Sequence, residues 1–400
     1  MIIHKPQVTK TEKEIIVSAK IESTNFLIEA PDTLWFKFPL SYQDYITDRA
    51  DGFVVGLLPT AMKLGENIEV EGDMSPRLAH GIEEYQQVQK VWWPRQFKKI
   101  DIIYKSVKKD ADTGKKGATG CSFSGGVDSF YTLWKHLPEN ETIPDYRITH
   151  CLLINGFDKD VDLENTGLFD RTKQVYEPMF HELGLNLLIS CTNLQEFRLA
   201  AIESRDLHCS FGSAITASVL VLGNLLSRFY LPGSHTYEYD RLIPEGAHAV
   251  LDHLLSTENL EIIHDGAEAS RVEKTTTISN WPATYSKLRV CFNKTKFNNQ
   301  TGVIENCCRC EKCIRTMISL DLLKALSKYE TFPITLQLKN ICKTRFINKG
   351  FRLFCKENLR MAKKKKRHRM TLVLFYSIIQ GLVLEKIIRP IYRKFIVEKP

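Results

Sequence analysis

The sequence predicts an α/β protein built around a doubly wound parallel sheet. From Ala118 onward, short apolar runs typical of strands alternate with helical stretches of about 12–18 residues. Parallel strands cannot be joined by tight turns, so this alternation indicates βαβ crossover units. A chain of 400 residues with 43% hydrophobic and 26% charged residues is also long and apolar enough to bury a large core.

The expected elements follow in order along the chain. In the first part of the chain, three β-type runs and one helix are expected, at Ile15–Val17, Phe26–Ile28, Leu34–Phe36 and Arg77–Val91. The later strands are expected at Cys121–Phe123, Ile148–Ile154, Leu187–Cys191, Phe229–Leu231 and Leu260–His264. The helices among them are expected to begin near Asp128 and to span Thr166–Leu183 and Phe211–Leu226. Ligands bind beyond the carboxyl ends of parallel strands, so residues that follow these strands are candidates for a site.

Composition divides the chain into three predicted domains. Residues 1–110 are expected to form an α+β N-terminal domain, and no catalytic constellation is recognisable in them. A polar connector at Lys105–Gly120 leads into the second domain, residues 111–330. Residues 331–400 are expected to form a basic helical region. From Lys339 to Pro400 there are 18 basic and 3 acidic residues, net +15, whereas the rest of the chain holds 37 and 44, net −7.

Cysteine usage and the N-terminal residues indicate a reducing compartment. The chain has 11 cysteines, an odd number, and four of them are packed between Cys307 and Cys313. Such cysteines are expected to be reduced or metal-bound rather than paired in disulfides. The first residues turn polar at Lys5 and lack the apolar run of a secretory signal, so a cytoplasmic protein is expected.

A glycine-rich loop is the sharpest motif, and it comprises Ser124, Gly125, Gly126, Val127, Asp128 and Ser129. The loop lies between an expected strand and an expected helix. Two glycines allow a tight turn, and the amides that open a helix favour a phosphate. A carboxylate beside a phosphate is repulsive unless a cation bridges them, so Asp128 predicts Mg²⁺ at this position.

A structural alternative exists for the same loop. A serine or aspartate can cap a helix while glycines merely shape the turn. The strand–loop–helix context and the whole string SGGVDS favour nucleotide binding over this alternative. The loop is not a Walker loop, because no Gly-Lys-Ser/Thr follows it.

A cysteine ladder near residue 310 predicts a metal site. Cys307, Cys310 and Cys313 are spaced as Cys-x2-Cys-x2-Cys, and Cys291 lies upstream after a strand-like run. Four thiolates of this kind suit a closed structural Zn²⁺ site, a zinc knuckle. Iron–sulfur ligation and redox chemistry stay open as alternatives, because the ligands alone do not fix the metal. Cys308 is surplus to the ladder.

The loop and the ladder together resemble one branch of the PP-loop ATP pyrophosphatase superfamily, the 7-cyano-7-deazaguanine synthase-like proteins of the queuosine pathway. The resemblance covers about Ala118 to Lys324 and rests on the order and spacing of the two motifs. It implies an adenine nucleotide alpha hydrolase-like fold with ATP, Mg²⁺ and Zn²⁺ as cofactors. It also implies that Gly233 lies in a second nucleotide-binding loop and that Arg271 and Lys274 lie near the phosphates.

The resemblance further implies an ATP-dependent ligase or amidating enzyme. Such an enzyme transfers AMP to a carboxylate or carbonyl oxygen, releases pyrophosphate, and lets ammonia or another nitrogen nucleophile displace AMP. Asp128, Lys274 and Arg271 are then the expected catalytic residues. The acceptor, a small molecule or a macromolecule, is not specified by the sequence. Two other functions remain open: sulfur transfer to tRNA, and an ATP-binding component of a defence or surface-polysaccharide assembly.

The basic tail carries a separate prediction. Seven residues, Lys363–Arg369, precede an apolar run at Thr371–Leu384. Fourteen helical residues measure about 21 Å, less than the ~30 Å hydrocarbon core, so this run is not expected to span a bilayer. It is expected either to pack on the protein's own core or to dock on an anionic surface, membrane or RNA. A homodimer is left open as the assembly.

Overall fold

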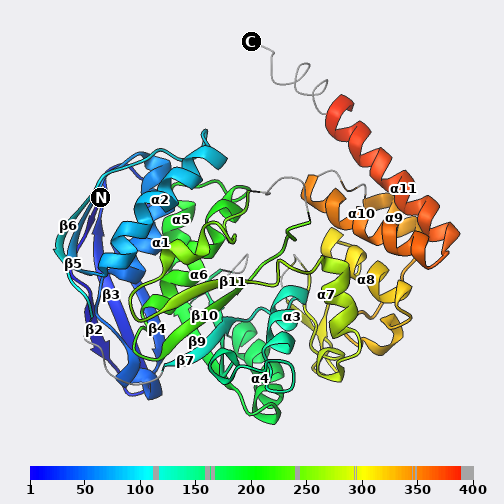
Figure 1. Cartoon of the computed structure of the whole chain (residues 1–400), viewed down its shortest axis with the longest axis horizontal. Helices are drawn as coiled ribbons and strands as arrows, with labels where there is room; N and C mark the ends of the chain where they lie inside the picture. Colours follow the sequence, from blue (N-terminus) through cyan, green and yellow to red (C-terminus); the bar gives the residue numbers. More distant parts are fainter. Residues whose placement is uncertain are drawn as a thin grey trace. The chain divides into compact units, whose positions relative to one another are not determined.

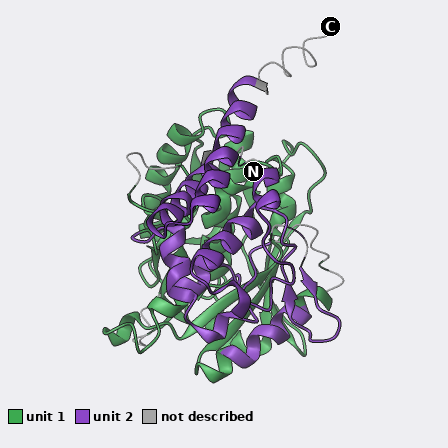
Figure 2. Cartoon of the chain, turned by 90° about the vertical axis from the view of Figure 1, so that its right-hand side faces the viewer, with its two compact units in different colours: residues 1–123, 132–169, 180–267 green, residues 124–131, 170–179, 268–400 purple. Residues whose placement is uncertain are grey.

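The structure is a computed structural model that describes residues 1–110, 117–157, 163, 167–238, 244–291, 293, 295–344, 346 and 349–388. The chain forms two compact units (Figure 2). Unit 1 comprises residues 1–123, 132–169 and 180–267, and unit 2 comprises residues 124–131, 170–179 and 268–400. The three domains predicted from the sequence, residues 1–110, 111–330 and 331–400, have other boundaries than these two units. The domain boundaries stay a prediction. The connector residues 111–116 lie outside the described residues.

Unit 1 is an α/β unit with a mostly parallel central sheet, as the sequence predicts. The described part of the sheet has eleven strands in the order β11-β10-β7-β8-β9-β4-β3-β1-β5-β6, with β2 paired to β3 (Figure 1). Five strands are parallel to one another: β11 (Glu261–Asp265), β10 (Leu226–Pro232), β7 (Ala118–Ser122), β8 (His150–Asn155) and β9 (Asn186–Thr192). The chain passes from β7 to β8 and β9 and then returns to the other side of β7 through β10 and β11. The strand order therefore reverses at β7.

The N-terminal strands extend the same sheet. β4 (Thr33–Pro39) pairs antiparallel with β9, and β3 (Glu14–Glu22) pairs antiparallel with β4. The remaining strands are β1 (Ile2–Ile3), β2 (Gln7–Lys10), β5 (Ile68–Met74) and β6 (Ile102–Val107). Buried residues alternate along β3 and β4, which is the period-2 pattern that predicted both strands.

The helices of unit 1 include one that the sequence did not reveal. The expected helix near residue 77 is α2 (Pro76–Trp92), and two further helices are α5 (Leu194–Leu199) and α6 (Phe211–Leu220). The additional helix is α1 (Asp51–Leu64), which is buried over nearly its whole length and packs against α6. A Cβ at Gly52 would lie 2.6 Å from the backbone oxygen of Ala217, so only glycine permits this close approach. α1 is apolar on all sides, which removes the periodic signal that identifies a surface helix.

Two expectations about individual elements are wrong. Phe26–Ile28 is not a strand; the side chains of Leu27 and Ile28 are 69% and 61% exposed. The helix that begins at Phe211 ends at Leu220 rather than Leu226, because Leu226 already starts β10. The helix expected at Thr166–Leu183 is α4 (Gly167–Glu182), and Thr166 itself lies outside the described residues. α3 (Val127–Lys135) confirms the helix expected near Asp128.

Unit 2 contains the C-terminal helices and a short hairpin. Its helices are α7 (Arg271–Ile278), α8 (Glu311–Leu322), α9 (Leu338–Thr344), α10 (Lys349–Lys364) and α11 (His368–Val383). The hairpin pairs β12 (Lys296–Phe297) with β13 (Ile304–Glu305). The helices enclose an apolar core that includes Ile314, Ile318, Ile341, Leu374 and Ile378.

The last helix is longer than the apolar run that predicted it. α11 continues through a π-helical turn, Leu384–Ile388, so that helical structure is uninterrupted from His368 to Ile387. These 20 residues are long and apolar enough to cross a membrane by length and composition, and no other helix among the described residues is. The estimated length of about 21 Å is therefore too short, because the helix does not stop at Leu384. The expectation that this segment does not span a bilayer stays a prediction.

A buried carboxylate fixes the end of β11 to the last turns of α3. Asp265 accepts hydrogen bonds from Thr132 Oγ1 and Lys135 Nζ, both at 2.7 Å, and its Oδ1 lies 3.1 Å from His136 Nε2. Burial alone would raise the pKa of Asp265, but the neighbouring His136 and Lys135 outweigh it, so this pKa is lowered. The carboxylate therefore contributes stability above its unfolded pKa of about 4.

Replacing Asp265 by alanine is expected to lower the free energy of unfolding by about 3 kcal/mol, because Lys135 and His136 lose a buried partner. Acidification below about pH 4 should destabilise the wild type, because the unfolded state then binds a proton at this carboxyl group while the folded state, with its lowered pKa, does not. It should destabilise Asp265→Ala less. Chemical denaturation between pH 3 and pH 7 measures both effects. Glu261→Ala, at the exposed start of the same strand, is the control and should change stability by less than about 0.5 kcal/mol. Equal effects of the two substitutions would contradict this role.

Candidate functional site

The glycine-rich loop lies in unit 2 and is held in a tight turn. Gly125 has a φ of +73°, and a Cβ at this position would lie 1.8 Å from the hydroxyl oxygen of Tyr176. The amide of Arg289 donates a 2.7 Å hydrogen bond to the carbonyl of Gly125. The loop conformation therefore requires glycine at residue 125, both for its backbone angle and for space.

The two serine hydroxyls of the loop hold the turn together. Ser129 Oγ donates to the carbonyl of Gly126 at 3.1 Å and accepts from the amide of Ser124 at 3.3 Å. Ser124 Oγ accepts from the amide of Gly126 at 3.3 Å. In this structure the hydroxyls shape the turn, which is the structural alternative to phosphate binding that the sequence also allowed. Val127 opens α3 and is buried.

Asp128 lies among positively charged side chains of α7. Its carboxylate is 2.7 Å from Arg271 Nη2 and 3.5 Å from Lys274 Nζ, and its side chain is 17% exposed. Burial would raise the pKa of Asp128, but Arg271 and Lys274 more than offset burial, so the pKa is lowered and the group is ionised. The three predicted catalytic residues thus come together in unit 2, although Arg271 lies 143 residues and Lys274 146 residues after Asp128 in the sequence.

Two further cations belong to this cluster, and the sequence analysis missed them. Lys312 and Arg315 lie on α8, and their charges also lower the pKa of Asp128. Arg315 is 3% exposed, and burial lowers the pKa of Lys312 to about 8. A spacing of three residues places both side chains on one helix face. That spacing, at the last cysteine of the ladder, was the available signal.

Both guanidinium groups of this cluster contact one aromatic ring. The guanidinium of Arg271 lies 5.0 Å from the ring centre of Phe354, and that of Arg315 lies 4.2 Å from it. Within the described residues, neither Arg271 Nε nor Arg315 Nε has a hydrogen-bond partner. Guanidinium donors suit the oxygens of a carboxylate or phosphate.

Acidic side chains lie among these cations. Glu311 lies 3.3 Å from Arg315 Nη1, and Glu357 also acts electrostatically on Arg315. The charged groups described here are thus the cations Arg271, Lys274, Lys312 and Arg315 and the acids Asp128, Glu311 and Glu357. Buried cations gathered in this way are suited to hold an anion.

Gly233 is placed in unit 1, whereas the loop residues belong to unit 2. Gly233 directly follows β10, and its amide donates a 2.7 Å hydrogen bond to the carbonyl of Asp265. A Cβ on Gly233 would lie 2.3 Å from His264 Nε2, so glycine is needed for packing here. Its role in nucleotide binding stays a prediction.

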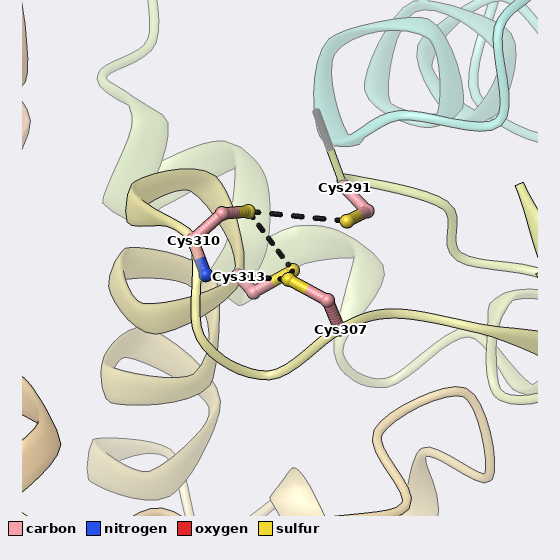
Figure 3. A group of neighbouring side chains, drawn as sticks. All are labelled: Cys291, Cys307, Cys310 and Cys313. Carbon is pink, nitrogen blue, oxygen red and sulfur yellow. Dashed lines mark hydrogen bonds between the residues drawn. The ribbon is translucent and has the colours of Figure 1, made fainter. Parts of the chain in front are cut away.

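The three ladder cysteines and Cys291 come together as a group that could hold a metal ion (Figure 3). The sulfur atoms of Cys291 and Cys310 are 3.9 Å apart, those of Cys307 and Cys313 are 3.8 Å apart, and those of Cys310 and Cys313 are 3.4 Å apart. A tetrahedron with metal–sulfur bonds of about 2.3 Å has edges of about 3.8 Å. The cysteines are therefore arranged as a four-thiolate site requires.

Local structure explains why these cysteines meet. Cys310 precedes the first residue of α8 and Cys313 lies in its first turn, while the amide of Cys310 donates to Cys307 Sγ at 3.2 Å. The buried Asn306 accepts hydrogen bonds from the amides of Val290 and Cys291 through its Oδ1, which fixes Cys291 beside the ladder. Cys308 is outside the group and donates to the carbonyl of Asn306.

Comparison with known proteins adds no relative. No family model, no curated protein and no solved structure matches this chain.

The cysteine group predicts one tightly bound metal ion per chain. Cys310→Ser should lose this ion and destabilise unit 2, because binding energy at such a site is also folding energy. Cys308→Ser is the matched control, since it changes a neighbouring buried thiol that is outside the group. Elemental analysis and thermal unfolding measure both outcomes. A full complement of metal in Cys310→Ser, or none in freshly reduced wild-type protein, would contradict the assignment.

The crowded glycine predicts a second outcome. Gly125→Ala and Gly302→Ala both place an alanine at positive φ, +73° and +70°, in the same unit. A Cβ at Gly302 meets nothing within 4 Å, so that variant should lose only about 1 kcal/mol from backbone strain. Gly125→Ala should lose a further 1–3 kcal/mol, on the order of other overpacked sites. Denaturant unfolding measures the difference, and equal losses would show that Tyr176 does not constrain the loop.

Proposed function

We propose that this chain is an ATP-dependent enzyme that adenylates a carboxylate or carbonyl oxygen and releases pyrophosphate. The observation that carries the proposal is the loop SGGVDS at the start of a helix, with Asp128 enclosed by Arg271 and Lys274. This arrangement combines a tight backbone turn with concentrated positive charge, which is the chemistry that a polyphosphate needs.

In the proposed reaction an oxygen of the acceptor attacks the α-phosphorus of ATP. The bond from the α-phosphorus to the bridging oxygen breaks, pyrophosphate leaves, and AMP stays on the acceptor. A nitrogen nucleophile then displaces AMP. Arg271 and Lys274 neutralise the negative charge that develops during phosphoryl transfer, and Lys312 and Arg315 add to this field.

Mg²⁺ fits the proposed site through Asp128. Carboxylate oxygen is the ligand type that Mg²⁺ prefers alongside substrate phosphates, and the low pKa of Asp128 keeps this ligand ionised. With Asp128 on the ion, the guanidinium of Arg271 is available to phosphate oxygens. The ion supplies charge neutralisation for the departing pyrophosphate.

The metal proposed for the cysteine group is zinc, in a structural role. Four sulfur ligands leave no open position for a substrate, which is typical of structural rather than catalytic zinc. The same spacing supports an adenine nucleotide alpha hydrolase-like fold and a place near the 7-cyano-7-deazaguanine synthase-like branch as parts of this proposal. The ion would stabilise the start of α8, from which Lys312 and Arg315 project.

A nitrogen rather than a sulfur donor is favoured by the state of two cysteines outside the group, Cys191 and Cys209. Sulfur relay needs a thiolate with a low pKa. Burial raises the pKa of Cys191 to about 11 and that of Cys209 to about 12. Both thiols are therefore protonated near neutral pH and suited to packing rather than to nucleophilic attack.

The test is ATP turnover, with AMP and pyrophosphate measured separately. Ammonia is supplied as the nucleophile, and a panel of carboxylates and nucleobases is supplied as acceptors. Lys274→Met keeps the length of a buried side chain but removes its charge, and should lower turnover by about 10²–10³-fold. Lys343→Met, at an exposed position of α9, is the control and should leave turnover unchanged.

The outcomes separate the alternatives. ATP binding by calorimetry without turnover on any acceptor would favour a nucleotide-binding component over an enzyme. Full turnover in a folded Lys274→Met protein would refute the site. Release of ADP and phosphate instead of AMP and pyrophosphate would refute the reaction.

A further inference from the structure

An exposed apolar stripe runs along α11. It consists of Leu372, Phe375, Tyr376, Ile379 and Val383, with side chains between 39% and 69% exposed. Successive residues of a helix are rotated by about 100°, and the five positions therefore fall within an arc of about 100° on one face. A continuous apolar face of this kind on a folded unit marks an interaction surface.

The opposite face of α11 is part of the folded core. Met370, Leu374 and Ile378 are buried together with side chains of α8 and α9, and α11 packs against α9 and α10. Ser377 adds a hydrogen bond to the carbonyl of Ile341. The helix is therefore anchored to unit 2 along one side, and the stripe is presented by a fixed element.

A basic cluster lies directly before the stripe. Its seven residues, Lys363–Arg369, are all exposed, and the sequence contains no acidic residue from Lys363 to Leu384. His368 and Arg369 begin α11 and fall on the same face as the stripe. Arg367 forms an ion pair with Asp321 at 2.8 Å, which ties the cluster to α8.

The basic cluster also lines a cavity of about 520 Å³. Lys366, Arg367, His368 and Arg369 contribute one part of its wall, and Leu336 and Leu338 contribute an apolar part. The acidic Asp321 also lines it and is paired with Arg367, so the basic side chains outnumber the acidic one. Positive and apolar groups around one hollow match the phosphate and the adjoining glycerol ester of a phospholipid.

We propose that α11 and the basic cluster form a docking surface for an anionic phospholipid membrane, with the helix lying in the interface. The stripe would enter the boundary of headgroups and acyl chains, while the lysines and arginines would meet anionic headgroups. This surface is independent of the proposed ATP chemistry.

Three features favour this occupant over others. Nucleic acid offers phosphates but nothing that would bury aliphatic side chains such as Leu372 and Ile379. A second copy of the chain would bring its own basic cluster and no matching acidic patch on α11. A membrane-spanning helix would have to separate its buried face from α9 and α10 and break the ion pair of Glu385 with Arg352.

The test is co-sedimentation of the full chain with vesicles of phosphatidylcholine alone or with one quarter phosphatidylserine. Binding should require phosphatidylserine and weaken as salt rises. Lys364→Gln/Lys365→Gln should weaken it about 25-fold, at about fivefold for each lysine. Lys328→Gln/Lys343→Gln changes two other exposed lysines of unit 2 and should have little effect.

A second pair of variants tests the stripe. Leu372→Gln/Ile379→Gln should weaken binding by at least tenfold, on the order expected when buried apolar area is lost. Val91→Gln/Ile103→Gln is the matched control, because both side chains are strongly exposed and lie in unit 1. Thermal unfolding checks that each variant is folded.

Four results would overturn the proposal. They are equal binding to neutral and anionic vesicles, binding that resists alkaline carbonate as a spanning helix does, binding to RNA without binding to vesicles, and a dimer that the stripe variants dissociate. Absence of vesicle binding would not argue against the proposed ATP turnover, and absence of ATP turnover would not argue against this membrane-docking surface.

Discussion

The pairing of Asp128 with Arg271 and Lys274 is the interaction on which the candidate site depends. Lys274 is fully buried, and a buried cation is stable only with a partner of opposite charge. Asp128 supplies that partner from the first turn of α3, and it thereby holds the glycine-rich loop beside α7 within unit 2. In the proposed function the same pairing keeps two cations where a polyphosphate would need them, so stability and the proposed anion binding would share one set of residues.

The cysteine group acts on this cluster through one helix. Cys310 directly precedes α8 and Cys313 lies in its first turn, and Lys312 and Arg315 lie within one turn of Cys313. Ordering the four cysteines therefore also orders two cations that act on Asp128. Phe354 contacts the guanidinium groups of both Arg271 and Arg315. A metal ion at the cysteine group would in this way help to set the geometry of the charged cluster.

Sequence patterns predicted elements best where burial is one-sided. The sequence identified β3, β4, β9 and α2 because alternation or helical periodicity shows which face is buried. α1 was missed because it is apolar all round, and Phe26–Ile28 was taken for a strand because a short apolar run does not record its partners. Among site residues, the loop and the ladder were found by local spacing. Lys312 and Arg315 were missed because their importance depends on neighbours distant in sequence.

The sequence by itself determined the α/β class, the glycine-rich turn and the spacing of the cysteine ladder, because each depends on residues close together along the chain. The sequence also predicted Cys291 as the fourth cysteine, and the structure brings it to the other three. Only the tertiary structure decided that α8 adds Lys312 and Arg315 to the charges around Asp128 and that one face of α11 stays exposed. These are long-range outcomes: they depend on which surfaces meet when the core forms. Charge pairing and burial act through space, and local sequence carries no record of those distances.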